Sequence, residues 1–219
     1  MAFGEFTCPY CNVVIASDLG EGHFVECNTC HKSSVKDGSS SRNNEAIVED
    51  AETLSPIIIG SKGKVNGDTF EVIGCITLYQ LRTSLNLFSI LWNNGSEGYL
   101  IDWDGDYAIL SKSQQILNKT VNLDDLLKRT KLDGEIDIPE FGMAYCYFID
   151  KIESIAIKGS GKAAFEKYTN SVFCAYFSEK GKEAYSFISK SSCSLLTGIS
   201  YEFNELNLNQ TRTINGWYK

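Results

Sequence analysis

The chain has 219 residues and a formal net charge of −8 at pH 7, with 28 acidic and 20 basic side chains. This acidic balance argues against a protein that binds the phosphate backbone of nucleic acids through a broad basic face. No apolar run approaches the roughly 20 residues of a membrane-spanning helix, and no signal-peptide pattern begins the chain. We therefore expect a cytoplasmic protein with one ordinary domain and a small appendage, or with two modest domains.

Two Cys-x-x-Cys pairs stand near the N-terminus, Cys8 with Cys11 and Cys27 with Cys30. Their spacing is typical of a zinc ribbon, in which a hairpin joins two knuckles and four thiolates bind one ion. Four thiolates complete a tetrahedral shell, so we predict that the zinc is structural. A redox dithiol is disfavoured because the βαβ context of thioredoxin-like motifs is absent. His31 follows Cys30 and is predicted to be a neighbour, not a ligand.

Residues 1–31, the predicted ribbon, contain no Lys or Arg but carry four acidic side chains. Four thiolates and one zinc ion add a formal charge of about −2. We therefore expect this ribbon to repel nucleic acid and to bind a protein partner. A fold of this size gains most of its folding free energy from the metal.

Residues 32–53 are polar and rich in serine, which predicts a flexible linker. Residues 54–208 are predicted to form an all-β domain of barrel or sandwich type, and residues 209–219 a C-terminal tail. Hairpin turns are expected at Asn66-Gly67, at Asn93-Asn94-Gly95 and at Asp104-Gly105.

Leucines at helical spacing predict one short helix within residues 121–129, after which the β pattern returns. Two β halves thus flank the helix, Gly60–Ser111 and Gly134–Phe203. This arrangement suggests a divergent internal duplication, in which each half is a meander of short strands.

Three other patterns resemble sites but have simpler interpretations. Asp102–Asp106 alternates carboxylates, but the sixth and twelfth positions of a calcium loop hold Tyr107 and Ser113, so we predict a turn with solvated acidic flanks. Lys158–Lys162 lacks the spacing of a phosphate loop and is predicted to be a hairpin tip. The remaining cysteines are predicted to be reduced, buried, small hydrophobes instead of a second metal site: Cys75, Cys146, Cys174 and Cys193.

The chain has only two histidines, His23 and His31, and both lie in the predicted ribbon. Histidine-based acid–base catalysis in the β domain is therefore excluded, and no pair of carboxylates stands out as catalytic. We predict a protein that is not an enzyme. Most of the many aromatic residues are expected to pack in the core, and the sequence does not distinguish them from aromatics that line a groove.

The first β half carries glycines at characteristic places, Ile59-Gly60-x-x-Gly63-x-x-x-Gly67-x-x-Phe70-x-Val72-Ile73-Gly74, then Gly95-x-x-Gly98-Tyr99-Leu100 and Gly105-x-Tyr107. Together with a closing motif at Leu196–Leu206, this string resembles the bacterial domain of unknown function 4178, which often follows a Cys-x-x-Cys ribbon. The resemblance covers about Leu54–Leu208. Where that family has a Trp-x-Glu-Trp-like string, this chain reads Leu85-Asn86-Leu87-Phe88, so any role of that glutamate is not expected here.

The resemblance implies an accessory or adaptor role on the cytoplasmic side of the bacterial envelope, near membrane-stress proteins. We therefore predict a non-enzymatic binding or adaptor module with a protein partner and only indirect membrane association. The alternative is a sensor of a small polyamine-like cation, or an enzyme-accessory domain, which an acidic concave pocket would favour. Nucleic-acid binding through the ribbon is the weakest of the three.

Overall fold

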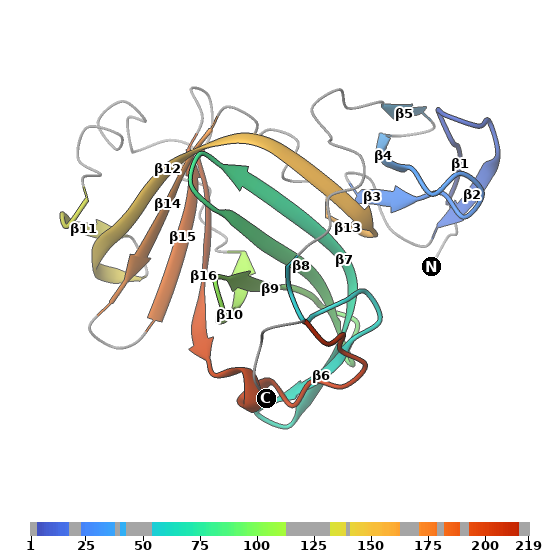
Figure 1. The fold of residues 1–219 in the computed structure, drawn as a ribbon. Helices are drawn as coiled ribbons and strands as arrows, with labels where there is room; N and C mark the ends of the chain where they lie inside the picture. Colours follow the sequence, from blue (N-terminus) through green and yellow to red (C-terminus); the bar gives the residue numbers. More distant parts are fainter. Residues whose placement is uncertain are drawn as a thin grey trace.

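The computed structural model describes residues 4–17, 23–37, 40–42, 54–112, 132–138, 141–162, 171–178, 182–188 and 193–214. In these ranges the regular elements are strands, apart from the short 3-10 helix η2 (Phe203–Leu206), as Figure 1 shows. The predicted all-β class is confirmed. The helix expected within 121–129 lies outside the described residues. No helix in the described ranges has the length and apolar character needed to cross a membrane.

The first half of the β domain is a meander in which each strand pairs antiparallel with the next. The predicted turn at Asn66-Gly67 is confirmed, because both residues have positive φ, 53° and 94°. Asp104 and Gly105 also have positive φ, 53° and 92°, as the primed turn of a two-residue hairpin requires. The strands are β6 (Lys62–Val65), β7 (Asp68–Gln80), β8 (Ser84–Trp92), β9 (Glu97–Trp103) and β10 (Asp106–Lys112).

The second half repeats this plan of one short strand, one long strand and three further strands. Its long strand has 18 residues, and its register against β7 shifts between Ile152 and Ser154. The strands are β11 (Glu135–Ile138), β12 (Gly142–Gly159), β14 (Val172–Phe177), β15 (Lys182–Ile188) and β16 (Cys193–Tyr201).

Two pairings join the halves into a closed sheet. β10 pairs with β16, and β12 pairs with β7 through residues 152–159. The earlier part of β12, residues 145–151, pairs with β14 within the second half. In Figure 1 the gold strand β12 arches over the molecule between these two neighbours. Among the described strands the closed ring runs β7-β8-β9-β10-β16-β15-β14-β12, so the domain is a barrel and not a sandwich.

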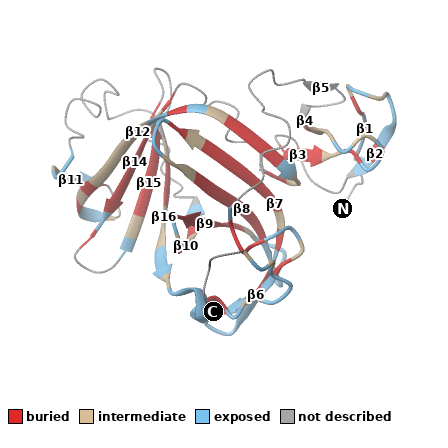
Figure 2. Ribbon diagram, in the orientation of Figure 1, coloured by how far each residue is buried: buried red, intermediate tan, exposed pale blue. Residues whose placement is uncertain are grey.

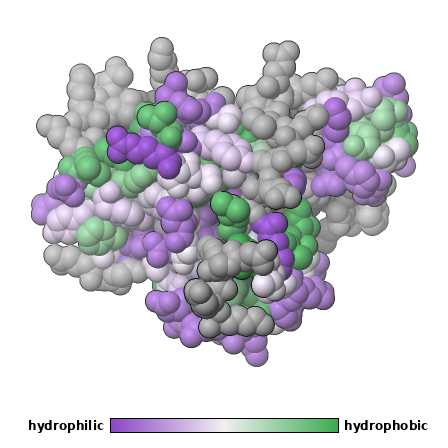
Figure 3. Space-filling view, in the orientation of Figure 1, coloured by the Kyte–Doolittle hydropathy of each residue, from purple (hydrophilic) through white to green (hydrophobic). Residues whose placement is uncertain are grey.

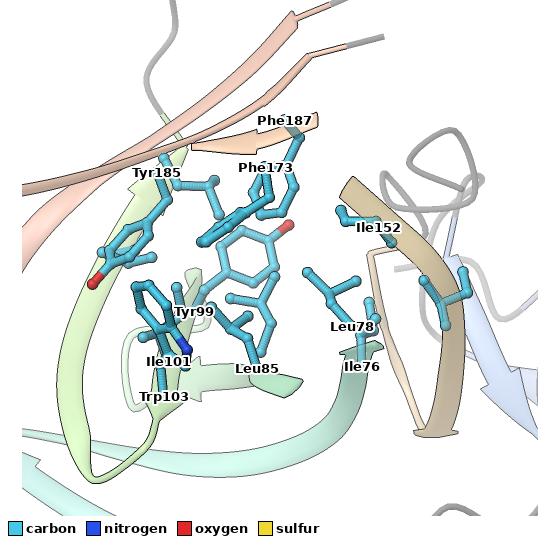
Figure 4. Packing of buried hydrophobic residues seen from close by; sticks show 14 of the residues in the cluster. Ile76, Leu78, Leu85, Tyr99, Ile101, Trp103, Ile152, Phe173, Tyr185 and Phe187 are labelled. Carbon is cyan, nitrogen blue, oxygen red and sulfur yellow. The ribbon is translucent and has the colours of Figure 1, made fainter. Parts of the chain in front are cut away.

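Apolar side chains fill the interior of this ring, as expected for a barrel of about eight strands. Trp103 lies among aromatic rings, with centroids 4.5 Å from Phe148 and 5.7 Å from Phe173. Figure 4 shows inward-pointing residues converging from both halves, and Figure 2 shows that buried residues dominate β7, β8 and β15. The interior core therefore depends on strands that are far apart in sequence.

A row of polar residues crosses the outer face of β7, β8, β9 and β10: Thr77, Asn86, Asp102 and Tyr107 stand opposite one another in register. The prediction that Asp102 is solvated is wrong, because only 4% of the residue is exposed. Residues 54–61 cover this face. A residue near the C-terminus holds them in place, because Arg212 Nε donates a hydrogen bond to the Ser55 carbonyl at 2.7 Å. The start of the predicted tail is thus part of the domain.

Burial raises the pKa of Asp102 to about 6, although a hydrogen bond from Ser55 and one from the Gly105 backbone lower it. Because the folded pKa exceeds the unfolded value, the folded state favours the protonated carboxyl. This contribution is complete below about pH 4 and is lost as the pH rises through about 6.

We expect Asp102→Asn to gain stability relative to the wild type as the pH rises from 4 to 7. The pKa difference corresponds to about 2 to 3 kcal/mol in the free energy of unfolding. Urea unfolding of both proteins across this pH range measures it, with Asp104→Asn as the exposed control in the same turn. A difference between Asp102→Asn and wild type that does not vary with pH would contradict the assignment.

Candidate metal centre

The first knuckle joins β1 (Gly4–Thr7) to β2 (Val14–Ser17) and holds Cys8 and Cys11. The Cys8 amide donates to the Val13 carbonyl at 2.8 Å, and the Asn12 amide donates to the Cys8 carbonyl at 3.0 Å. Asn12 has a φ of 59°, a left-handed conformation that asparagine tolerates well. These bonds turn both cysteine side chains to the same side of the loop.

The second knuckle joins β3 (His23–Glu26) to β4 (Ser33–Asp37) and repeats this geometry at Cys27 and Cys30. The Cys27 amide donates to the Lys32 carbonyl at 3.0 Å, and the His31 amide donates to the Cys27 carbonyl at 2.8 Å. His31 takes the left-handed position, with a φ of 58°. The two pairs therefore present their sulfurs in equivalent ways.

The four sulfur atoms meet, and all lie within 4.8 Å of one another. Cys8 Sγ is 3.7 Å from Cys30 Sγ, and Cys11 Sγ is 3.6 Å from Cys27 Sγ. A tetrahedral ion with metal–sulfur bonds of about 2.3 Å requires sulfur separations of about 3.8 Å. Among the described residues this is the one group of three or more His, Cys, Asp or Glu side chains close enough to hold an ion. The residues thus fit a four-coordinate metal.

The pKa values of Cys27 and Cys11 shift in opposite directions. The backbone amides of Cys30 and Thr29 lower the pKa of Cys27 to about 6, against the opposing effect of burial. The Val13 amide lowers the pKa of Cys11, but burial and the surrounding sulfurs raise it overall to about 12. Four thiolates at these distances repel one another, and a bound divalent cation would favour deprotonation of all four.

His31 lies outside the sulfur cluster. Its side chain is 74% exposed, and its Nδ1 is 3.3 Å from Glu26 Oε1. The arrangement agrees with the prediction that His31 is a neighbour of the site and not a ligand.

The ribbon is larger than the sequence predicts. Residues 33–37 form β4, which pairs with β3, and residues 40–42 form β5 (Ser40–Arg42), which pairs with β4. This part of the expected linker is therefore strand and not flexible chain. The serines that suggested a linker are compatible with an extended backbone, and pairing between neighbouring strands of this sheet satisfies backbone amides and carbonyls. The rest of 43–53 lies outside the described residues.

The ribbon is attached to the barrel by strand pairing with the segment that follows β12. β13 (Gly161–Lys162), just beyond the end of β12, pairs with β3, and Phe24 of β3 is fully buried in the interior core cluster. A Cβ atom at Gly161 would collide with the Ser89 side chain, so glycine is required there. The glycine-rich segment that looks like a hairpin tip is thus the docking strand for the ribbon.

Polar contacts reinforce this docking. His23 Nε2 is 3.0 Å from Glu97 Oε1, and the Gly159 amide donates to Glu26 Oε2 at 3.0 Å. His23 is only 7% exposed, and Glu97 comes from β9 of the barrel. The sequence contains no local signal for this pair, because its members are 74 residues apart.

The cysteines outside the ribbon that the structure describes are buried, as predicted: Cys75, Cys146 and Cys174. Cys75 packs on the outer face of the first half, whereas Cys146 and Cys174 pack together in a cluster on the second half. None of them belongs to the metal-binding group found in the described ranges. The side chain of Cys193 lies outside the described residues.

No protein-family model, curated protein or solved structure matches this chain. The resemblance to domain of unknown function 4178 therefore stays a prediction. The class that the structure itself defines is an all-β protein, in which a cysteine-rich ribbon is docked on a closed barrel.

We expect Cys27→Ser to lose tight metal binding, because it removes one of four ligands and the thiol most readily ionised. Affinity should fall by at least about tenfold, and the ribbon should lose the folding free energy that the ion supplies. Cobalt titration, which reports tetrahedral thiolate coordination by its absorption, measures this. Cys75→Ser is the matched control and should bind cobalt as the wild type does. Equal binding by Cys27→Ser would contradict the centre.

We expect His23→Asn to loosen the ribbon from the barrel without removing the metal, since the substitution breaks the contact with Glu97. The cost should be about 1 to 2 kcal/mol. Hydrogen exchange of the β3 and β13 amides should become faster. His31→Asn, in the same ribbon but exposed, should leave that exchange unchanged. Identical exchange in the two variants would show that the His23 contact does not hold the ribbon.

Proposed function

We propose that the protein is a non-enzymatic adaptor module, with a structural zinc ion in its cysteine centre and a ribbon surface that binds a protein partner. Zinc is the natural occupant of a tetrahedral site with four thiolates. Cys8, Cys11, Cys27 and Cys30 would hold the ion, and it would link the two knuckles. With all four positions taken by sulfur, none remains for a substrate or water, which supports a structural role.

The observation that carries the proposal is an exposed apolar surface on the first knuckle. Tyr10, Val13 and Val14 are 36%, 37% and 61% exposed. Figure 3 shows hydrophobic residues gathered over the β1–β2 end of the ribbon, which in Figure 1 faces away from the barrel. We refer to these three residues as the knuckle patch. Apolar residues presented together in this way are typical of protein-binding sites.

Charge supports the choice of a protein over a nucleic acid. Residues 1–31 contain no Lys or Arg. The first basic residue of the chain, Lys32, makes a cation–π contact, with its Nζ 5.0 Å from the Tyr10 ring centroid. The matching partner would present an apolar side chain flanked by basic residues. The resemblance to the bacterial family supports an accessory role on the cytoplasmic side of the envelope.

The distribution of histidine supports a non-enzymatic role. Both histidines of the chain lie in the ribbon, and His23 is engaged by Glu97. No imidazole is therefore available in the barrel for acid–base chemistry.

The proposal is tested by affinity capture from the native host, with the full-length chain as bait. Truncation of residues 1–31 is unsuitable, because it would remove Phe24 from the barrel core. We expect the double substitution Val13→Ser and Val14→Ser to weaken capture of the partner by at least about tenfold. Leu81→Ser, at a barrel residue that is 70% exposed, is the matched control and should capture the partner normally.

Metal content measured on each bait shows whether the ribbon has remained folded. If a reproducible partner is captured equally by the knuckle double variant, the knuckle patch is not the binding surface. If the wild-type bait captures no reproducible partner, the adaptor role itself is overturned.

A further inference from the structure

A cavity of about 510 Å³ opens at one end of the barrel, beside the β9–β10 turn. The ends of β14 and β16 and the start of β15 meet there, with η2 at the edge. We refer to it as the rim cavity. Its volume is in the range of small-molecule sites. Its described lining includes the carboxylates of Asp106, Glu183, Glu202 and Glu205 but no Lys, Arg or His.

Glu183 is the central charged group of the rim cavity. Its carboxylate accepts hydrogen bonds from Tyr147 Oη at 3.2 Å and from Ser200 Oγ at 3.0 Å. Burial raises its pKa, against the effect of these two hydrogen bonds. No ion pair to Glu183 occurs among the described residues, so its carboxylate is oriented by hydroxyl groups and not by a cation.

Aromatic rings form the other walls of the cavity. Tyr147 and Phe177 lie with ring centroids 5.8 Å apart, and Phe177 remains 43% exposed. Tyr107 also lines the cavity and is only 4% exposed, yet its hydroxyl has no hydrogen-bond partner in the described part of the chain.

We propose that the rim cavity binds a small organic cation whose ammonium groups are separated by methylene chains, such as an aliphatic polyamine. Ammonium groups suit the unpaired carboxylates, and aromatic faces attract cations and pack against methylenes. This inference is independent of the ribbon surface and of the metal centre.

A metal ion fits the same residues less well. The carboxylates of the cavity do not converge on one point. Among the described residues, the four cysteines of the ribbon are the one group of acidic, cysteine or histidine side chains close enough to hold a single ion. Hard cations require about six or more oxygen ligands around a single point. Separate negative charges along a cavity instead match separate positive charges along a flexible ligand.

The test is calorimetric titration of the full-length protein with spermidine, at low and at moderate salt. We expect one binding site, and Glu183→Gln should weaken it by about tenfold or more. Glu153→Gln is the matched control, because it removes the same charge from an exposed position of β12 outside the cavity. Its affinity should stay within about twofold of wild type.

Phe177→Ala separates aromatic recognition from charge alone. It removes a partly exposed wall without opening the core, and it should also weaken spermidine binding severalfold. Equal losses from Glu153→Gln and Glu183→Gln would show only general attraction to an acidic protein and would overturn the proposal. Competition by magnesium at matched ionic strength, or no binding by the wild type, would overturn it as well. None of these results depends on the knuckle patch.

Discussion

The pairing of β12 with two different neighbours is the constraint on which the rest of the structure depends. Its first half pairs with β14 and its second half with β7, so one strand closes the sheet between the two halves of the domain. Closure satisfies backbone groups that would otherwise form open edges, and it creates the enclosed interior that the aromatic residues fill. The chain just beyond the end of the same strand, at Gly161, then provides the edge on which the ribbon pairs.

This arrangement makes the ribbon part of the barrel's structure. Phe24 contributes to the interior core, while Cys27, a few residues later, contributes to the sulfur cluster. Strand β3 therefore links the folding free energy of the metal centre to that of the barrel. The β1–β2 end of the ribbon, which carries the knuckle patch, lies away from this junction (Figure 1), so a partner could bind there without disturbing the docking contacts.

The acidic character of the chain has a different consequence in each part of the molecule. In the ribbon it disfavours nucleic acid around a site that is itself negatively charged. At the rim of the barrel it is concentrated with aromatic rings in a concave site. On the outer face of the meander, Asp102 is buried under residues 54–61, and this burial raises its pKa and disfavours the charged carboxylate. Net charge alone does not separate these three environments.

Local sequence was sufficient for the elements whose geometry is local. The cysteine spacing predicts the four-sulfur cluster, because each knuckle is closed by hydrogen bonds within six residues. The Asn-Gly and Asp-Gly pairs predict their hairpins, because only a few residue types adopt positive φ readily. The linker prediction failed for β4 and β5, since serine-rich composition does not reveal a pairing partner. The solvated environment expected for Asp102 also failed, because residues far along the chain cover it.

The sequence by itself therefore determined the class of fold, the turns and the ligands of the candidate metal centre, all of which depend on short-range spacing and backbone preference. Only the tertiary structure decided that the sheet closes, that the ribbon is docked through Phe24 and the His23–Glu97 contact, and that Glu183 shares a cavity with Tyr107 and Tyr147. These features join residues tens of positions apart. Their proximity depends on strand register, which no local pattern encodes.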